Sequence, residues 1–534
     1  MVYLPGLATI PPLDRDEARF AQASKQMIET GDLIDIRLQD EPRHKKPAGI
    51  YWMQAATAKI LTPFHPTAIW LYRLPSVVGA IAAVLLTHAL ALHLFGRRIA
   101  LIGAGALALS VMLVSEAHQA KTDAMLLATV CGAQLALARL YRPLENGPGA
   151  ATPYLFWGAL GISFMIKGPI GLMVVALTIL ALALADRRVA WLKPLLNLRA
   201  VLLFCLVAAP WYIAIAIVTK GAFFGAAVGE DLGAKLVAGQ ESHGAPPGYY
   251  LLLMVATLWP ASLLAWPALV AAWREFRLPE IRFLLAWVVP SWLVFEIVPT
   301  KLPHYTLPTY PALAVLAAVA IVGALSQVDS PLARALQHRV TRYFAFLWGG
   351  IGGLLAIAAV ALPLFFERGV ALWSVAGALG LLLTVILTTR WMWQGQIQRI
   401  LPALTIAALL VYPTVFGGTL PHLRTFFVGD QIAAMLTQID PDRTRPVSVV
   451  GFSEPSMVFR AGTDIKLRAP AEGVHDLAEI PQALVLVEDG RNAKFQEFVA
   501  EIALQLRPLG EISGFNYSKG KKVHIIVYER AAGE

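Results

Sequence analysis

The amino-acid sequence predicts a polytopic α-helical membrane protein with a small α/β domain at its C-terminal end. Hydrophobic residues make up 57% of the 534 residues and charged residues only 15%, whereas soluble domains have about 45–50% and about 25%. The apolar residues gather into long runs separated by short basic loops, and the chain becomes far more polar from about residue 421. A chain with so many apolar residues needs lipid around much of its surface.

The apolar runs have the length of membrane-spanning helices. A transmembrane helix needs about 20 apolar residues, because about 30 Å of hydrocarbon is crossed at about 1.5 Å per residue. Twelve runs approach that length. They lie near residues 70–95, 100–115, 119–139, 153–165, 168–186, 200–218, 249–272, 282–299, 306–325, 343–365, 370–388 and 400–417.

Arginine and lysine residues occupy every second connection between these runs, as at Arg97–Arg98 and Arg187–Arg188. The positive-inside rule places such loops in the cytoplasm. The intervening loops, which include 13–69 and 219–248, and the C-terminal region are then external. Membrane topology therefore explains the net charge of +9. No sequence pattern typical of nucleic-acid binding is present. We therefore expect a multi-pass membrane protein in contact with membrane lipids.

The first external loop begins after an apolar segment. Residues 1–12 are typical of the end of an apolar helix, so we expect that a first span is missing and that the membrane-spanning module, 1–420, has twelve or thirteen helices. The periodicity of Asp16–Ile34 predicts an amphipathic helix lying at the membrane interface and ending at Gly31. A second short helix is predicted over 48–61.

The C-terminal region, 421–534, predicts a small α/β domain outside the membrane. Short apolar runs at 447–452, 483–487 and 523–528 are typical of strands. Residues 492–506 have the pattern of an amphipathic helix.

Ionisable residues close to lipid are costly and therefore mark candidate sites. Asp16 and Glu17 open the first external loop, where paired carboxylates suit general-base chemistry or metal binding. The alternative is that both acids complement the dipole of the helix that they begin. Lys46 belongs to a basic cluster suited to a lipid phosphate, or to general attraction by anionic headgroups. Asp123 follows Thr122, and the alternative to a catalytic acid is a first-turn acid behind an N-cap.

Other candidates lie in the later external loops. In the loop 219–248, His243 could bind metal or phosphate, or be an ordinary solvated histidine. Lys301, His304 and Tyr305 stand at an external helix entrance, where an interfacial lysine and an aromatic belt are the alternative. Glu116 and Lys121 accompany Asp123 without an assigned role, and the turn at Lys167-Gly168-Pro169 is interpreted as structural, with Lys167 snorkelling.

These motifs together, in this order, resemble a known family. The sequence is similar to the aminoarabinose transferase (ArnT-like) branch of the protein O-mannosyltransferase superfamily. The motifs are Arg15–Phe20, Gly31-Asp32, Lys46-Pro47 followed by Tyr51-Trp52, Lys167–Pro169 and Lys301–Tyr305. The resemblance implies a GT-C fold, a periplasmic active site and an undecaprenyl-phosphate-linked sugar donor.

The resemblance also implies roles for particular residues. Asp16, with Glu17 beside it, matches the family's first-loop acid, and Asp123 matches the second. Lys46 matches the lysine that holds the carrier phosphate, Tyr305 a tyrosine near the donor, and Lys235 an arginine that contacts phosphate. The chain departs from the family at Lys45, where the family pattern Phe-Glu-Lys-Pro has an acid that can help to hold a metal.

The sequence therefore predicts a glycosyltransferase that moves a sugar from the carrier lipid to a lipid A-like or other envelope acceptor. No cofactor is assigned, and a divalent metal at Glu17 or His243 stays open. Absence of a Walker or Rossmann motif argues against a nucleotide donor. A polyprenyl-lipid flippase is the alternative, but the expected midplane polar groups and inverted repeats are not seen. A scaffold for a periplasmic partner would leave the acids and Lys46 unexplained.

Overall fold

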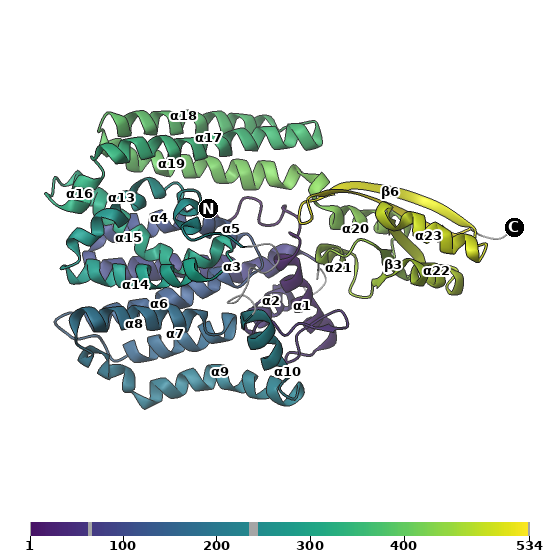
Figure 1. Cartoon of the computed structure of the whole chain (residues 1–534), viewed down its shortest axis with the longest axis horizontal. Coiled ribbons are helices and arrows are strands. Elements are labelled where there is room, and N and C mark those ends of the chain that lie inside the picture. The colour runs from purple at the N-terminus through teal and green to yellow at the C-terminus, as the bar shows by residue number, and fades with distance from the viewer. Residues whose placement is uncertain (1, 62–66, 234–243, 532–534) are drawn as a thin grey trace.

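The computed structural model describes residues 2–61, 67–233 and 244–531. A bundle of helices forms the larger part, and a domain built on a β-sheet lies at one end of the bundle (Figure 1). The described helices of the bundle are α3 (Ile69–Phe95), α4 (Arg97–Ala108), α5 (Val111–Ala117), α6 (Asp123–Tyr141), α7 (Thr152–Lys167), α8 (Ile170–Asp186), α9 (Leu198–Val218), α10 (Ala222–Phe224), α12 (Tyr249–Thr257), α13 (Ser262–Ala272), α14 (Pro279–Ile297), α15 (Tyr310–Leu325), α16 (Pro331–Ala335), α17 (Arg339–Glu367), α18 (Leu372–Trp393) and α19 (Ile400–Tyr412).

Each of the twelve predicted apolar runs is helical in this structure. Within the described residues, seven helices are long and apolar enough to cross a membrane, or eight when the bent pair α4 and α5 counts as one span. Breaks and short helices account for the lower number. The run at 249–272 is divided into α12 and α13, α4 and α5 meet at 60°, and α8 has only 17 residues.

The basic connections gather at the end of the bundle opposite the sheet domain. Arg142 pairs with Glu280 at 2.9 Å, and Arg282 pairs with Asp186 at 3.0 Å. These contacts join three connections that the positive-inside pattern assigns to one side. The sheet domain, α1 (Asp16–Thr30) and α2 (Gly49–Leu61) lie at the other end (Figure 1). The loops rich in arginine and lysine therefore lie at one end of the folded bundle, and the intervening loops lie at the other end.

Helix α1 ends as predicted, at Gly31 with φ of 76°, a conformation that glycine adopts without strain. Its apolar face packs against protein, and its position at the membrane interface stays a prediction. Ten of its 15 residues are buried, because it packs between α2 and α21 (Pro455–Ala461) of the C-terminal domain. A helical period marks an apolar face but does not tell lipid from protein. A short hairpin, β1 (Arg37–Leu38) with β2 (Glu41–Pro42), separates α1 from α2.

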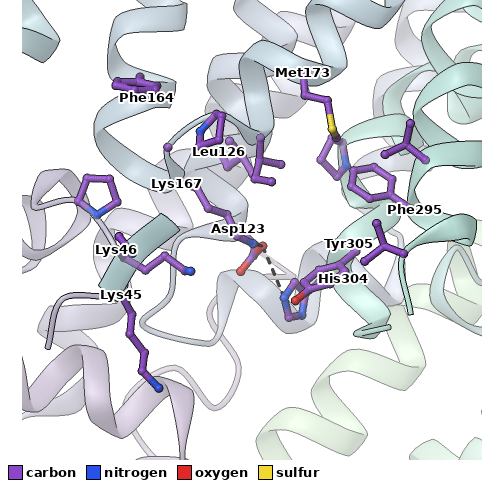
Figure 2. A pocket seen from close by; sticks show the side chains of 18 of the residues that line it. Lys45, Lys46, Asp123, Leu126, Phe164, Lys167, Met173, Phe295, His304 and Tyr305 are labelled. Atoms are coloured by element: carbon purple, nitrogen blue, oxygen red, sulfur yellow. Dashed lines mark hydrogen bonds and ion pairs between the residues drawn. The ribbon is translucent and has the colours of Figure 1, made fainter. Parts of the chain in front are cut away.

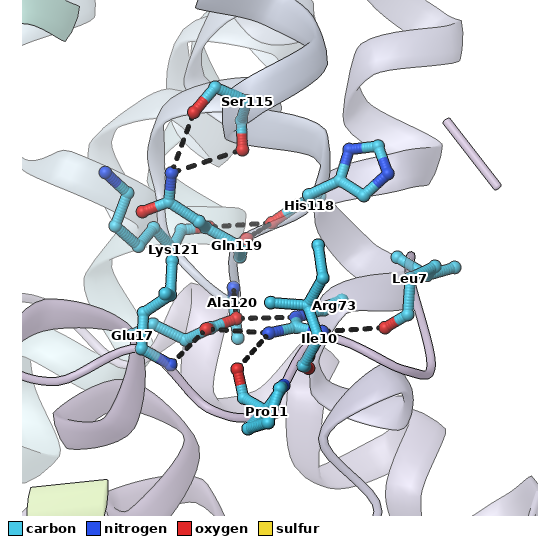
Figure 3. A network of polar contacts seen from close by, with 12 residues as sticks. Leu7, Ile10, Pro11, Glu17, Arg73, Ser115, His118, Gln119, Ala120 and Lys121 are labelled. Carbon is cyan, nitrogen blue, oxygen red and sulfur yellow. Dashed lines mark hydrogen bonds and ion pairs between the residues drawn. The ribbon is translucent and has the colours of Figure 1, made fainter. Parts of the chain in front are cut away.

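A buried arginine anchors the start of the chain to the bundle (Figure 3). Arg73 of α3 is 0% exposed, and all five of its N–H groups donate hydrogen bonds. Two go to the Glu17 carboxylate at 2.8 and 2.9 Å, and three go to the carbonyls of Leu7, Ile10 and Pro11 at 2.7 to 3.1 Å. The described residues 2–12 therefore form turns around Arg73, and the helix end predicted there is not present.

The C-terminal domain is a five-stranded mixed sheet in the order β4-β3-β5-β7-β6. Strand β3 is parallel to β4 and β5, and β7 is antiparallel to β5 and β6. Helices α20 and α21 cover one face, and α22 and α23 cover the other. The elements are α20 (Val428–Ile439), β3 (Val447–Val450), α21, β4 (Lys466–Arg468), α22 (Pro470–Glu479), β5 (Leu484–Glu488), α23 (Asp489–Glu501), β6 (Leu506–Asn516) and β7 (Lys521–Arg530).

The three strands predicted in this domain are present as β3, β5 and β7. Strands β4 and β6 were not predicted, and the helix expected to reach residue 506 ends at Glu501. Strand β6 contains Pro508, Gly510 and Gly514, and only Ile512 and Asn516 of its residues are buried. It lacks the apolar alternation that marks a half-buried strand.

The C-terminal domain docks on α1 through polar contacts. Gln22 donates to Thr463 at 2.8 Å, and Lys25 donates to the Phe459 carbonyl at 3.3 Å. Asp14 lies in the same interface, where burial raises its pKa to about 6, above its usual 3.8, aided by the nearby Glu454 carboxylate and partly offset by hydrogen bonds to Ser456. The folded protein thus binds a proton at Asp14 more tightly than the unfolded chain does.

We expect Arg73→Met to destabilise the protein, because it leaves Glu17 charged and buried without its partner. Breaking such a pair costs about 3–5 kcal/mol. Thermal unfolding in detergent, followed by tryptophan fluorescence, measures the effect against Arg98→Ala, which removes an exposed arginine. A melting temperature equal to that of Arg98→Ala would contradict the anchoring role.

Asp14 should make the protein less stable as the pH rises from about 4 to 6, since its pKa is raised from 3.8 to about 6 on folding. Asp14→Asn should therefore raise the melting temperature above pH 6 and leave it unchanged near pH 4. The measurement is a pH series of melting curves, with the exposed Glu145→Gln as control. A higher melting temperature of Asp14→Asn at all pH values would contradict a role for the titration of Asp14.

Candidate functional site

Two cavities adjoin where the helical bundle meets α1 and the segment before α2. One, of about 530 Å³, is mostly apolar and is lined by Leu126, Phe164, Met173 and Phe295, among others. Figure 2 shows residues that line this first cavity. The other, the polar cavity of about 730 Å³, is lined by many more charged side chains and is bordered by α1, the segment before α2 and the connection from α5 to α6. Six residues line both cavities: Lys45, Lys46, Asp123, Lys167, His304 and Tyr305. A ligand with an apolar tail and a charged head could therefore lie across this border.

Asp123 is the central acid of the border. It begins α6 and forms an ion pair with Lys167, the last residue of α7. The Nε2 atom of His304 lies 3.8 Å from the same carboxylate. Thr122 does not cap α6 as expected; its hydroxyl lies 3.4 Å from Asp123. The Lys167 ammonium also lies over the ring of Tyr305, 5.6 Å from its centre.

A second carboxylate faces His304 from the other side. The Nδ1 atom of His304 is 3.9 Å from Glu116, which accepts a hydrogen bond from Lys121 at 3.0 Å. Burial alone would lower the pKa of Lys121, but the carboxylates of Glu116, Asp123 and Asp16 outweigh it and raise that pKa above its ordinary value. Acids and bases thus alternate through the site, and each buried charge has a counter-charge.

Asp16, in the first turn of α1, lines the polar cavity. Its side chain is accessible from the cavity, although protein surrounds it on most sides. Burial raises its pKa, but the interactions with Lys121, His304 and Arg43 outweigh burial, so the pKa lies below its usual value. Asp16 is therefore ionised at neutral pH and can accept hydrogen bonds from a ligand.

Glu17 is placed differently, although it neighbours Asp16 in sequence. It is 1% exposed, and both its oxygens are taken by Arg73 (Figure 3). They also accept hydrogen bonds from the N–H groups of Leu13 at 2.8 Å and Ala120 at 2.9 Å. These four contacts fill the accepting positions of a carboxylate. The geometry suits an anchor rather than a base or a metal ligand.

Lys301 also lies apart from its neighbours His304 and Tyr305. Its ammonium donates to the carbonyls of Glu296 and Val298 at 2.8 and 2.7 Å, so it satisfies the C-terminal end of α14. It lines neither cavity. The prediction that Lys301 belongs to the pocket therefore does not match its position.

Two other predicted residues, Lys235 and His243, lie outside the described residues. Among the part of the chain that the structure describes, no three His, Cys, Asp or Glu side chains form a group that could hold a metal ion. Asp123 and Glu116 are each paired with a lysine, and Lys45 and Lys46 line the same border. This donor set does not fit a divalent cation, which would add positive charge to an already cationic border.

Four functional candidates were missed or given no role at the sequence level. Lys167 was interpreted as part of a structural turn, and Glu116 and Lys121 were noted without a role. Arg73 was not noticed, although a single arginine within an apolar run is itself a signal.

Comparisons with known proteins agree with this geometry. The dolichyl-phosphate-mannose-protein mannosyltransferase family matches residues 45–213. Undecaprenyl phosphate-alpha-4-amino-4-deoxy-L-arabinose arabinosyl transferases of Pectobacterium atrosepticum and Aeromonas salmonicida are 28% identical over 372 residues and 29% identical over 369 residues. In both comparisons the match covers 68% of this chain and 64% of the relative, so the chain spans less than two thirds of these relatives' length.

Solved structures extend the likeness to the whole chain. ArnT from Cupriavidus metallidurans bound to undecaprenyl phosphate superimposes with a TM-score of 0.76 at 19% identity, over 98% of this chain and 96% of that one. An oligosaccharyltransferase from Archaeoglobus fulgidus gives a TM-score of 0.52 at 11% identity, over 98% and 71%. The chain is therefore a polytopic membrane protein with the GT-C fold. Its sequence and fold are similar to those of the ArnT proteins, the resemblance that the sequence motifs predicted.

We expect Asp123 and Lys167 to be energetically coupled, because each is the other's partner in a largely buried site. Asp123→Asn and Lys167→Met should each lower the melting temperature, and the double variant should lose less than the sum. Residues in direct contact couple by about 0.5–3 kcal/mol. A double-mutant cycle of unfolding measures the coupling, and strictly additive losses would show that the ion pair is absent.

Proposed function

We propose that this chain is a membrane glycosyltransferase that takes a sugar from an undecaprenyl-phosphate-linked donor. The observation that carries the proposal is the pair of adjoining cavities, one apolar and one polar, with lysines at their border. The apolar cavity suits the polyprenyl chain, the border suits the phosphate, and the polar cavity suits the sugar and the acceptor. The activity for which the relatives are named, and the undecaprenyl phosphate bound in the Cupriavidus structure, support this assignment.

The reaction is a single displacement with inversion. An acceptor oxygen attacks the anomeric carbon while the bond between that carbon and the phosphate oxygen breaks, and the electron pair stays on the phosphate. Lys46, with Lys45 and Lys167 beside it, neutralises this leaving group. Stabilising the charge that develops in the transition state is usually the largest catalytic contribution. Lys235 and His243 stay predicted contributors to phosphate binding.

Asp16 acts on the acceptor. It is ionised and accessible from the polar cavity, so it can orient an acceptor hydroxyl and take its proton, an effect of about 10²–10⁴-fold. An acceptor that is itself a phosphate needs no base, and Asp16 then positions the sugar. Asp123 holds Lys167 and His304 in place, Tyr305 forms a wall beside the donor, and Glu17 anchors the loop that carries Asp16.

The acceptor is a lipid A-like molecule or another envelope glycan or lipid, reached at the periplasmic face. The periplasmic location is supported by the basic connections, which lie at the end of the bundle opposite the cavities. Basic connections are typical of the cytoplasmic side. A flippase would need polar groups along a path through the membrane. Here the ionisable residues of the site gather at one end, which favours a transferase.

Lys46→Ala should abolish sugar transfer and leave expression unchanged, because the leaving phosphate loses its principal cation. Mass spectrometry of lipids and lipopolysaccharide compares a deletion strain complemented with wild type, Lys46→Ala or Asp16→Ala. The expected result is the loss of one sugar from one envelope molecule and accumulation of its polyprenyl-phosphate donor in both variants. Lys59→Ala, which removes an exposed lysine from α2, is the control. Intact glycans with a redistributed carrier lipid would instead favour the flippase.

A further inference from the structure

The hairpin turn between β6 and β7 contacts the segment that leads into α1. The Tyr517 hydroxyl accepts a hydrogen bond from the backbone N–H of Asp14 at 2.5 Å. The Ser518 carbonyl accepts one from the Arg15 guanidinium at 2.8 Å. Both contacts span about 500 residues of sequence, and they end directly beside Asp16.

This turn is built as a rigid element. The buried Glu454 accepts hydrogen bonds from the Asn516 side chain at 2.8 Å and from the Ser518 hydroxyl at 2.9 Å. The Asn516 side chain in turn accepts from the Lys519 N–H at 3.1 Å. A turn held by a buried polar network keeps its shape and can therefore fix what it touches.

The backbone next to Asp16 needs such support. Arg15 has φ of 68°, a left-handed conformation that a residue with a side chain seldom adopts. Strain of this kind persists only where the surroundings hold it, and it concentrates at functional sites. On the other side of Asp16, Glu17 is held by Arg73. The backbone on one side of Asp16 is thus held by the C-terminal domain, through Arg15, and on the other side by the membrane bundle, through the ion pair of Glu17 with Arg73.

We propose that the Tyr517–Ser518 turn of the C-terminal domain is a positioning element that aims Asp16 into the polar cavity. This inference rests on the proposed function and deepens it, because it makes the C-terminal domain part of the catalytic apparatus. Tyr517 and Ser518 act through Arg15 and Asp14 and line neither cavity. They are positioning residues that do not touch the substrates.

Tyr517→Phe tests the proposal by removing one hydroxyl from the full-length protein. A misplacement of about 1 Å can lower a rate by about 100-fold, so kcat should fall by about 10- to 100-fold. KM for the undecaprenyl-phosphate-linked donor should stay unchanged, since Lys46 and the apolar cavity are untouched. Ser518→Ala, a milder change that loses the hydrogen bond to Glu454, should lower kcat by less.

Thr463→Ala is the matched control. It removes contacts between the same domain and the far part of α1, where Thr463 bonds to Gln22 and Glu29, but leaves Arg15 alone. The proposal is supported if Tyr517→Phe loses kcat while Thr463→Ala, with a similar melting temperature, keeps it. Equal kcat in all variants, or equal losses in Tyr517→Phe and Thr463→Ala, would overturn the positioning role. Wild-type protein that transfers no sugar would instead refute the proposed function itself.

Discussion

The buried ion pair between Arg73 and Glu17 is the interaction on which the rest of the site depends. It ties three parts of the chain together: α3, the first turn of α1 and, through the Ala120 N–H, the connection from α5 to α6. Those last two parts carry Asp16 and Lys121. Two charges that are removed from water stabilise a structure only when every polar group is satisfied, and here the arginine uses all five of its donors. The anchor therefore sets how far the acids and cations of the polar cavity lie from one another.

The position of the site follows from the cost of charge near lipid. Glu116, Lys121, Asp123, Lys167 and His304 lie at the ends of helices or between them, and all five line the polar cavity. The acids Glu116 and Asp123 pair with Lys121 and Lys167, which lowers the cost of burying these charges. The apolar cavity opens from the same point into the helical bundle. This juxtaposition suits a substrate that is itself half lipid and half polar.

The sequence indicated the region of the site, but not which of its residues line the cavities and which stabilise the fold. Asp16 and Glu17 are adjacent acids with the same expected chemistry. Asp16 lines the polar cavity, whereas Glu17 is buried in an ion pair with Arg73. Lys301 and Tyr305 belong to one motif, yet only Tyr305 lines the cavities. Consecutive residues on a helical turn point in different directions, so a motif cannot state which member meets the ligand.

The sequence by itself determined the class of protein, the helical runs, the alternation of basic loops and the presence of a C-terminal α/β domain. These features follow from composition and from local periodicity, which depend only on neighbouring residues. Only the tertiary structure decided that α1 is buried between two domains, that Lys167 pairs with Asp123, and that the β6–β7 turn reaches Arg15. Such contacts join residues that are far apart in the chain, and their energies depend on burial and geometry that no local pattern encodes.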